Sequence, residues 1–491
     1  MILDKIIKGT DIKSITGHAD TEVAGVAYDS RAVLPGYLFV AVRGENVDGH
    51  NFIEDAVGRG AVAVVCEEEP AGKAVEVPVV GVKDSRAALA AISNNFFGRP
   101  SESLYVIGVT GTNGKTTTTY LIKSILESWG KKVGLIGTIQ CMIGDEPYDA
   151  RHTTPEALEF QGLLHKMLIS GCTHVVSEVS SHALAQKRVD GTLFRTGVFT
   201  NLTRDHLDFH KTMEEYYLAK ERLFMELLHG AAVVNFDDQY GRRLIADINN
   251  LRTELKGCYT YGLEKGSDLM AAEIGKSFDK LRFKILDGGI HKVETSLTGL
   301  PNVYNILSAA GAAVSIGVPW DVILKGIRDA KAVRGRFERV EAGQKFLAIV
   351  DYAHTEDALE RLIYTARGLT EGKIITVFGC GGDRDAGKRP KMGAVATRLS
   401  DFVVITSDNP RSEKPEKITK EIEAGAVKRN YLIEPDRREA IRRAVLMARD
   451  NDVLLVAGKG HEGSQIVSGR SFHFSDREVL EEAIKQLVGN D

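Results

Sequence analysis

Short apolar runs alternate with helical stretches over most of this chain, and that alternation restricts the folds open to it. A short continuous apolar run suits a β-strand buried on both faces, and helices between such strands indicate a parallel, doubly wound sheet. The first group of candidate strands is Leu104–Val109, Lys132–Ile136, His174–Val179, Thr196–Leu202 and Ala231–Asn235. A second group follows Arg334 and comprises Phe346–Tyr352, Lys373–Gly379, Asp401–Ser407 and Asp452–Gly458.

Three α/β domains account for these patterns. The chain has 491 residues, which is too long for one hydrophobic core. Residues 1–100 alternate apolar runs with Gly and Asp turns and predict a small N-terminal α/β domain, ending near the linker that begins at Phe97. Residues 101–334 predict a central domain with a P-loop-type, doubly wound parallel sheet, and residues 335–491 predict a Rossmann-like domain.

Composition excludes several classes of protein. The formal net charge is −4, whereas a general nucleic-acid binder would have a basic excess. No apolar run is long enough to span a bilayer, and the N-terminus does not resemble a signal peptide. The 5 cysteines are scattered, without a Cys-x-x-Cys pair. We therefore expect a cytoplasmic protein with reduced thiols and no membrane or nucleic-acid partner. We also expect the protein to be a monomer.

The segment that begins Gly108-Val-Thr-Gly-Thr-Asn-Gly-Lys-Thr predicts a phosphate-binding loop. It follows a predicted strand and opens a helix expected over Lys115–Trp129. Glycines let the backbone turn N–H groups toward an anion, and the helix N-terminus adds partial positive charge. Lys115 suits the outer phosphates and the Thr116 hydroxyl suits Mg²⁺. The spacing is a variant, because Val109 occupies the position of the first glycine in the strict pattern.

Two other strand ends carry candidate metal or phosphate ligands. Glu178 ends an apolar strand, where a carboxylate can hold Mg²⁺ or simply face solvent. The next segment, Asn201-Leu-Thr-Arg-Asp-His-Leu-Asp-Phe-His, places His206 and His210 four residues apart. That spacing leaves zinc as an alternative, but no third ligand is evident and a Mg²⁺ or phosphate role is preferred. Lys220, by its residue context alone, is an ordinary helix lysine.

Taken as an ordered set, these segments resemble the Mur ligases over the full length of the chain. The matching segments begin at Tyr28 (Tyr-Asp-Ser-Arg), Gly111, Thr153 (Thr-Thr-Pro), Glu178 (Glu-Val-Ser-Ser-His), Asn201, Leu300 (Leu-Pro-Asn-Val-Tyr-Asn), Gly335 (Gly-Arg-Phe-Glu), Asp351 (Asp-Tyr-Ala-His-Thr) and Gly379 (Gly-Cys-Gly-Gly-Asp-Arg-Asp). The resemblance implies an ATP-dependent amide ligase that uses Mg²⁺ and forms an acyl phosphate.

The resemblance also implies roles for individual residues. The implied ATP contacts are Gly111, Thr112, Asn113, Gly114, Lys115, Thr116, Thr117, Asn302, Asn305, Arg336 and Asp351. The implied catalytic residues are Lys115, Glu178, His206 and Lys220, of which the last three, with Thr116, are implied metal ligands. Lys220 is implied to be carbamylated, since a carbamate supplies the oxygen ligands that Mg²⁺ prefers.

By the same resemblance the chain is similar to members that act on UDP-N-acetylmuramoyl-L-alanyl-D-glutamate. The implied contacts to this precursor are Tyr28, Ser30, Glu45, Asn46, Val47, His152, Thr153, Thr154, Ser180, Gln186 and Arg188. His152 stands where related enzymes often have Asn, so it departs from the family pattern.

The segment Asp408, Asn409, Pro410 and Arg411 resembles that of members that add meso-2,6-diaminopimelate. Arg411 and Arg384 are expected to be buried and to grip a carboxylate that lysine lacks, and Gly458 and Glu462 match further contacts. By itself the Asn-Pro pair also predicts a turn after a strand. The alternatives are a lysine-adding ligase, a folylpolyglutamate-type ligase, or a non-catalytic nucleotide switch.

Overall fold

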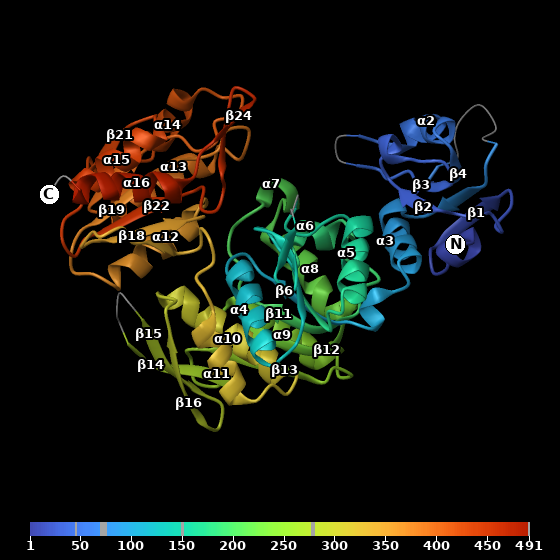
Figure 1. Ribbon diagram of the computed structural model, residues 1–491, viewed down its shortest axis with the longest axis horizontal. Helices are drawn as coiled ribbons and strands as arrows, with labels where there is room; N and C mark the ends of the chain where they lie inside the picture. Colours follow the sequence, from blue (N-terminus) through green and yellow to red (C-terminus); the bar gives the residue numbers. More distant parts are fainter. Residues whose placement is uncertain (45–46, 69–75, 149–151, 276–279, 490–491) are drawn as a thin grey trace.

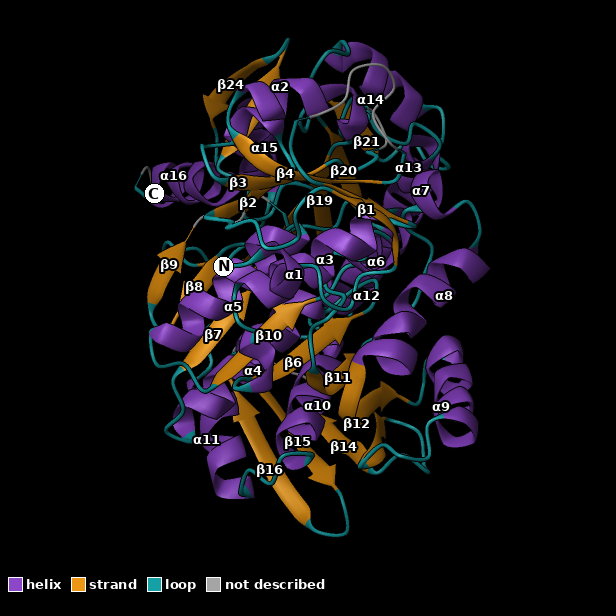
Figure 2. Cartoon of the chain, turned by 90° about the vertical axis from the view of Figure 1, so that its right-hand side faces the viewer, coloured by secondary structure: helices purple, strands orange, loops and turns teal. Residues whose placement is uncertain are grey.

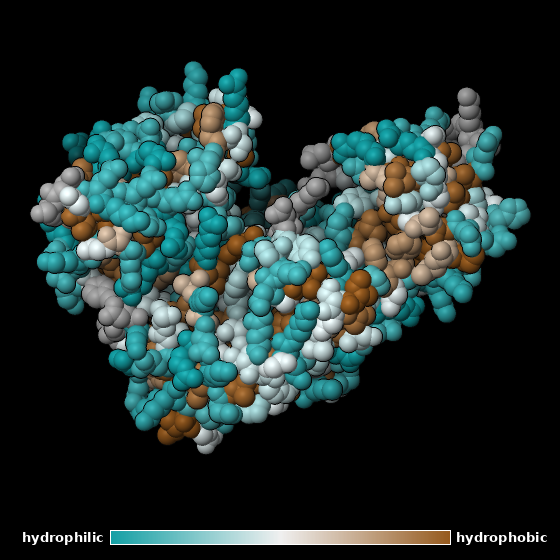
Figure 3. All heavy atoms as spheres, in the orientation of Figure 1, coloured by the Kyte–Doolittle hydropathy of each residue, from teal (hydrophilic) through white to brown (hydrophobic). Residues whose placement is uncertain are grey.

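The chain folds around three main β-sheets that follow one another along the sequence (Figure 1). This computed structural model describes residues 1–44, 47–68, 76–148, 152–275 and 280–489. Within those ranges the sheets have five, eleven and six strands, and a separate two-stranded hairpin lies near the C-terminus. A wide hollow separates the C-terminal and N-terminal parts above the central part (Figure 3).

The N-terminal sheet has the strand order β1-β5-β4-β3-β2, with β1 antiparallel to β5 and the other pairs parallel. Its alternating Val and Ala side chains are buried on both faces, which favours parallel pairing. The elements are α1 (Leu3–Ile6), β1 (Ile12–Thr16), β2 (Gly25–Ala27), β3 (Tyr37–Val40), α2 (Ile53–Gly58), β4 (Ala61–Cys66), β5 (Val79–Val82) and α3 (Ser85–Phe96).

The central sheet has the order β16-β15-β14-β13-β12-β11-β6-β10-β7-β8-β9 (Figure 2). Its strands are β6 (Tyr105–Thr110), β7 (Val133–Ile136), β8 (Cys141–Ile143), β9 (Glu146–Tyr148), β10 (His174–Glu178), β11 (Phe194–Phe199), β12 (Leu228–Asn235), β13 (Gly257–Gly262), β14 (Leu269–Gly275), β15 (Leu281–Leu286) and β16 (Ile290–Thr295). The strands from β14 to β7 pair in parallel, and antiparallel strands extend the sheet at both ends.

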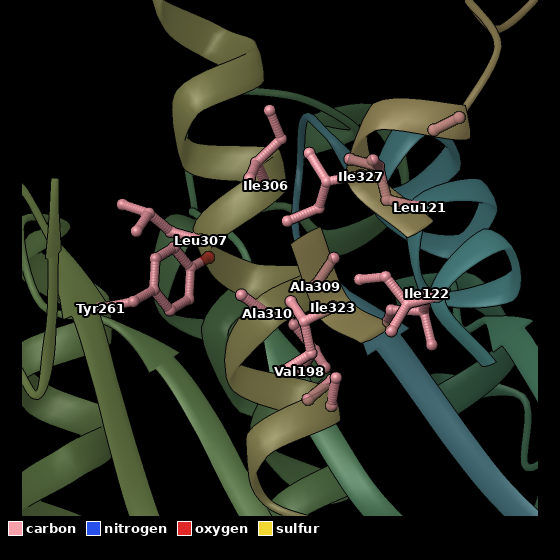
Figure 4. Close-up of a cluster of buried hydrophobic side chains, with 14 of the residues drawn as sticks. Leu121, Ile122, Val198, Tyr261, Ile306, Leu307, Ala309, Ala310, Ile323 and Ile327 are labelled. Carbon is pink, nitrogen blue, oxygen red and sulfur yellow. The ribbon is translucent and has the colours of Figure 1, made fainter. Parts of the chain in front are cut away.

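Helices cover both faces of this sheet, as a doubly wound fold requires. Side chains of α4, α10 and α11 pack into one buried cluster, which Figure 4 shows around Leu121, Ala310 and Ile323. Side chains of α5, α8 and α9 pack into the cluster on the other face. The helices are α4 (Lys115–Ser128), α5 (Ala157–Ile169), α6 (Ser181–Ala185), α7 (Leu207–His210), α8 (Met213–Arg222), α9 (Gln239–Leu251), α10 (Leu300–Val314) and α11 (Trp320–Asp329).

The C-terminal sheet has the order β17-β18-β22-β19-β20-β21, and only β17 is antiparallel to its neighbour among the described strands. Helices again cover both faces. The elements are β17 (Glu338–Val340), β18 (Leu347–Asp351), α12 (Glu356–Arg367), β19 (Ile374–Phe378), α13 (Lys388–Leu399), β20 (Phe402–Ile405), α14 (Pro415–Glu423), β21 (Tyr431–Ile433), α15 (Arg437–Met447), β22 (Val453–Ala457), β23 (Ser464–Val467), β24 (Arg470–His473) and α16 (Asp476–Val488).

These sheets confirm the predicted three-part α/β fold. Each apolar run named in the sequence forms a strand, with ends that differ by a few residues at most. The prediction of a purely parallel central sheet is wrong at its two ends, where β8 and β9 on one side and β15 and β16 on the other run antiparallel. Those strands alternate buried and exposed residues, so they lack the continuous apolar runs that reveal the parallel strands.

Candidate active site

Three neighbouring strands of the central sheet end at one edge, and their loops carry the candidate site. β6 lies between β10 and β11, with Glu178 beside Val109 and Phe199 beside Thr110. The carboxyl ends of parallel strands form the edge where ligands bind in such sheets. The loop at residues 111–114, Glu178 and the segment at residues 201–206 therefore start side by side.

The loop between β6 and α4 has a backbone that suits glycine. Gly111 and Gly114 have φ angles of +145° and +88°. A Cβ at Gly111 would lie 1.9 Å from Thr200 Oγ1, and one at Gly114 would lie 2.5 Å from Asn305 Oδ1. The loop is therefore tightly packed and leads directly into the N-terminus of α4, a favourable place for a phosphate.

Lys115, the first residue of α4, folds back over this loop. Its Nζ donates to the carbonyl oxygens of Gly111, at 3.0 Å, and Thr112, at 2.9 Å. Burial lowers the pKa of Lys115, and the nearby Glu178 and Asp205 partly oppose that shift. The amine therefore lies where phosphate oxygens can replace the two carbonyl acceptors.

Glu178 is a buried carboxylate surrounded by oxygen-bearing side chains. It is 1% exposed, and it accepts from Thr116 Oγ1 at 3.1 Å, Thr138 N at 2.9 Å and Thr138 Oγ1 at 3.0 Å. Among the described residues Glu178 forms no salt bridge, although it is close enough to Lys115 for the two charges to interact. The alternative that Glu178 faces solvent is wrong, and a buried carboxylate without a direct ion-pair partner is a favourable ligand for a metal ion.

Lys220 reaches the same loop from α8. It is 1% exposed, its Nζ donates to Gly111 O at 2.8 Å, and it lies 4.7 Å from the centre of the Tyr216 ring. Burial, reinforced by the charge of Lys115, holds the pKa of Lys220 well below its ordinary value. Lys220 does lie in a helix, but the interpretation of it as an ordinary helix lysine is wrong, because its amine is buried beside the phosphate loop.

His206 lies between these groups and solvent. Its backbone is left-handed, with φ +54°, and its ring centre is 4.7 Å from that of His182. The ring is 42% exposed, and its partial desolvation lowers its pKa, opposed by the charge of Asp205. A lowered pKa favours the neutral imidazole, which is the form that binds metals.

His210, the other histidine of the predicted pair, is engaged elsewhere. Its Nε2 lies 2.9 Å from Ser181 Oγ, and its ring stacks on Tyr216. Over the described ranges, no three His, Cys, Asp or Glu residues are grouped so that they could hold a metal ion. The zinc alternative therefore has no third ligand of these types in that part of the chain.

A cavity of about 220 Å³ joins these groups to the C-terminal domain. From the central domain it is lined by Thr112, Asn113, Gly114, Lys115, Thr116, Thr117, Thr138, Thr153, Glu178, Ser180, Asp205 and His206. From beyond residue 334 it is lined by Arg336, Asp351, Tyr352, Ala353, His354, Thr355 and Ala358. The site is thus built at the contact between two domains.

Two predicted ATP-site residues beyond the central domain have defined partners. The Arg336 guanidinium lies 4.6 Å from the centre of the Tyr352 ring, and its Nη2 is 3.5 Å from Thr116 Oγ1. The Asp351 carboxylate accepts from the backbone N–H groups of Phe337, at 2.7 Å, and Ala353, at 2.8 Å. Burial raises the pKa of Asp351. Arg336 faces the phosphate loop, whereas Asp351 holds the loop that follows β18.

Asn302 and Asn305 lie one turn apart on α10, behind the phosphate loop. Asn305 Nδ2 donates to Asn302 Oδ1 at 3.1 Å, and Asn302 Nδ2 donates to Thr298 O at 2.7 Å. Both are buried, and neither lines the cavity. The structure therefore places Asn305 against Gly114 and Asn302 one turn further away.

The predicted precursor contacts fall into two groups. Thr153 and Ser180 line the cavity, while Thr154, Gln186 and Arg188 form a framework beside it. In that framework Thr154 Oγ1 donates to Glu178 O at 2.8 Å, and Arg188 donates to Thr154 O at 3.1 Å and Gln186 Oε1 at 2.6 Å. His152 is exposed and lies outside the cavity.

The N-terminal group lies away from the cavity. Tyr28 donates to Glu159 Oε1 at 2.9 Å and so connects the N-terminal and central domains. Burial and Glu159 raise the pKa of this phenol. Ser30 is buried, and the Val47 side chain is exposed. Glu45 and Asn46 lie outside the described residues.

The predicted amino-acid contacts gather at the carboxyl edge of the C-terminal sheet. Asp408, Asn409 and Pro410 are buried just after β20, and a Cβ at Gly458 would lie 2.7 Å from Asp408 Oδ2. Asn409 Nδ2 donates to Glu462 Oε2 at 2.7 Å. The structure therefore brings together segments that are about fifty residues apart in the chain.

The two arginines of this region depart from the expected burial. Arg411 is half-buried, has φ +53°, and donates from Nη1 to Gly382 O at 2.7 Å. Arg384 is exposed, without a hydrogen bond or ion pair to another described residue. The expectation of buried arginines is wrong because both stand on loops beyond the strand ends, where the packed layers stop.

Several lining residues escaped prediction. Thr138, Asp205, Tyr352 and His354 line the cavity, and each lies within a few residues of a strand end. A systematic survey of polar residues after each predicted strand would have found Thr138, which follows the apolar run ending at Ile136. None of the described helices has the length and apolar character needed to cross a bilayer.

Family models and relatives match this chain over most of its length. The family descriptions "Mur ligase family, catalytic domain", "Mur ligase middle domain" and "Mur ligase, glutamate ligase domain" match residues 22–97, 109–313 and 335–460. A protein from Solibacter usitatus (strain Ellin6076) is 48% identical over 95% of this chain and 94% of its own length. One from Clostridium perfringens (strain 13 / Type A) is 44% identical over 98% of this chain and 99% of its own length.

Both relatives bear the name UDP-N-acetylmuramoyl-L-alanyl-D-glutamate--2,6-diaminopimelate ligase. A solved structure with that name superposes with a TM-score of 0.72 at 32% identity and covers 99% of each chain. The similarity spans all three sheets. The chain therefore belongs to the Mur ligase family.

Proposed function

We propose that this chain is an ATP-dependent ligase that joins meso-2,6-diaminopimelate to UDP-N-acetylmuramoyl-L-alanyl-D-glutamate, as a cytoplasmic monomer. One observation carries the proposal. The phosphate loop, Glu178, Thr153, Ser180, Arg336 and residues 351–355 line one cavity. A carboxylate substrate and the γ-phosphate of ATP can therefore meet at a single point.

The reaction has two balanced steps. The terminal carboxylate of the precursor attacks the γ-phosphorus of ATP, which breaks the bond to the β-phosphate and releases ADP. The amine of diaminopimelate then attacks the acyl carbon, loses a proton, and expels phosphate that retains one carboxylate oxygen. Lys115 and Arg336 are placed to offset the repulsion between the two anions in the first step.

The residues present suit Mg²⁺. Thr116 Oγ1 and the Glu178 carboxylate are 3.1 Å apart and supply the oxygen ligands that Mg²⁺ prefers. His206 and a carbamylated Lys220 would complete a second position. When bound, Mg²⁺ would neutralise phosphate charge and stabilise charge developing on the transferred group.

The surroundings of Lys220 support the carbamylation that the family resemblance implies. The amine form, which reacts with carbon dioxide, is favoured because burial and Lys115 lower the pKa of Lys220. The product would replace a neutral buried amine by an anion next to Lys115, whose positive charge would stabilise it.

The choice of diaminopimelate rests on the edge of the C-terminal sheet. Arg411 and Arg384 can bind the distal carboxylate, and Glu462 can accept from the neighbouring ammonium group. Lysine lacks that carboxylate, so it leaves the arginines without their partner.

A folylpolyglutamate-type ligase is less favoured, because the full-length similarity includes the N-terminal sheet. A non-catalytic switch is less favoured, because Lys115, Glu178 and Lys220 are all in place.

An amino-acid panel tests the proposal. Phosphate release is measured with ATP, the UDP-linked dipeptide and each of diaminopimelate, lysine and glutamate at matched concentration. We expect rapid turnover that needs both substrates, and a preference for diaminopimelate over lysine of about a hundredfold or more. Equal use of lysine would refute the amino-acid assignment, and turnover without either substrate would refute the ligase assignment.

Arg411→Ala should weaken diaminopimelate use. Lys428→Ala, at a surface lysine of the same domain, should not.

A further inference from the structure

Lys459 is fully buried between Gly458 and Glu462, next to the predicted amino-acid contacts. Its Nζ donates to Asn409 Oδ1 at 3.2 Å, Glu462 Oε2 at 3.2 Å and Ser464 O at 2.7 Å. An ammonium has three N–H donors, so these acceptors use them all. Lys459 therefore has no free donor for a substrate and acts on the residues around it.

Lys459 determines how the side-chain amide of Asn409 is oriented. Asn409 Oδ1 accepts from Lys459 and from Ile466 N, the latter at 2.9 Å. Only the oxygen of an amide can accept two donors, so the Nδ2 group must face the other way. That group donates to Glu462 Oε2 at 2.7 Å.

Glu462 is consequently held through one oxygen. Both donors, Asn409 Nδ2 and Lys459 Nζ, reach Oε2, and no donor in the described part of the chain reaches Oε1. The side chain is 32% exposed, unlike Lys459. One carboxylate oxygen is thus fixed in the protein, and the other is open toward a ligand.

We propose that Lys459 is a positioning residue for the incoming amino acid. It holds the Asn409 amide and the Glu462 carboxylate in the arrangement that presents Glu462 Oε1 to an ammonium group. The ligand that this fits is an amino-acid head, with its carboxylate toward Arg411 and its ammonium toward Glu462. The inference rests on the proposed function, since it concerns the site assigned there to diaminopimelate.

Steady-state kinetics of Lys459→Met, Glu462→Gln and the double variant test this role. The Michaelis constant is measured separately for diaminopimelate, ATP and the UDP-linked dipeptide, and thermal melting is recorded for each protein. Lys459→Met should raise the KM for diaminopimelate about tenfold or more and change the other two by less than about twofold. The double variant should be no worse than the poorer single variant, because Lys459 acts through Glu462. Lys428→Met, which removes a surface lysine bonded to Arg398 O, is the matched control and should leave all three constants unchanged.

An unchanged KM for diaminopimelate in folded Lys459→Met would overturn the inference, as would fully additive effects. Equal rises in all three constants with a lowered melting temperature would also overturn it, because they indicate a purely structural role. Should Lys459→Met lose its cooperative melt, Lys459→Gln, which keeps an N–H donor without the charge, is judged by the same criteria. A wild-type chain that makes no product with diaminopimelate would instead overturn the proposed function itself.

Discussion

Lys115 is expected to be needed for catalysis but not for the stability of the fold, and one substitution can test both points. Its Nζ contacts the Gly111 and Thr112 carbonyls, but the fold around it depends on glycine geometry and apolar packing. Lys115→Ala should therefore reduce ligation by about a thousandfold and leave the melting temperature nearly unchanged. Lys123→Ala on the same helix removes an ion pair with Glu127 and should remain active, which makes it the matched control. Near-normal turnover of folded Lys115→Ala would contradict the phosphate assignment.

Lys220 should carry a carbamate in the active protein. Lys220→Ala is expected to lose activity by about a hundredfold or more, and short carboxylates added to the solution should restore part of it. The wild-type protein should also lose activity in buffer depleted of carbon dioxide and regain it when bicarbonate is added. Intact-mass or carbon-13 spectra that find only a free amine in fully active enzyme would rule out the modification.

At the level of whole elements, α12 of the C-terminal domain is tied directly to the phosphate loop. Asp357 Oδ2 accepts from Thr203 Oγ1 at 2.9 Å and from Asn113 Nδ2 at 3.2 Å, so both contacts cross the domain boundary. Asp357→Ala should favour an open arrangement and lower kcat about tenfold, with little change in melting temperature. Small-angle scattering should report a larger radius of gyration.

The control for Asp357 is Glu360→Ala on the same helix, which removes an ion pair with Arg398 of α13. Glu360 has no hydrogen bond or ion pair with the described residues of the central domain. This variant should keep both the rate and the radius of gyration. If Asp357→Ala also keeps the wild-type rate and radius of gyration, α12 does not hold the domains together.

The elements most open to sequence reasoning are those with continuous apolar runs. β6, β10 and β22 are buried on both faces, so their composition alone identifies them. β15 is different because its outward-facing residues are polar, and only pairing with β14 and β16 makes it a strand. The same limit applies to the site. Glu178 and the phosphate loop stand at predictable strand ends, whereas the burial of Lys220 depends on how α8 packs against β6 and β11.

On the scale of the whole molecule, buried histidines should make stability depend on pH. His174 stacks on Tyr105, and burial lowers its pKa from 6.5 to about 4. As the pH falls, the His174 ring therefore takes up a proton in the unfolded chain at a higher pH than in the folded chain. The free energy of unfolding consequently falls as the pH drops from about 6.5 to about 4. His174→Phe keeps the stacked ring and should reduce this loss by about 3 kcal/mol in denaturant titrations. An equally steep loss in the variant would show that other groups dominate.

The central claim is that the cavity between two domains transfers the γ-phosphoryl group of ATP to a substrate carboxylate before an amide forms. The most direct measurement uses UDP-linked dipeptide whose terminal carboxylate carries oxygen-18, incubated with ATP and diaminopimelate. We expect each released phosphate to contain one oxygen-18 atom derived from that carboxylate, because the acyl phosphate breaks at its acyl–oxygen bond. Amide product accompanied by phosphate without the label would contradict the account.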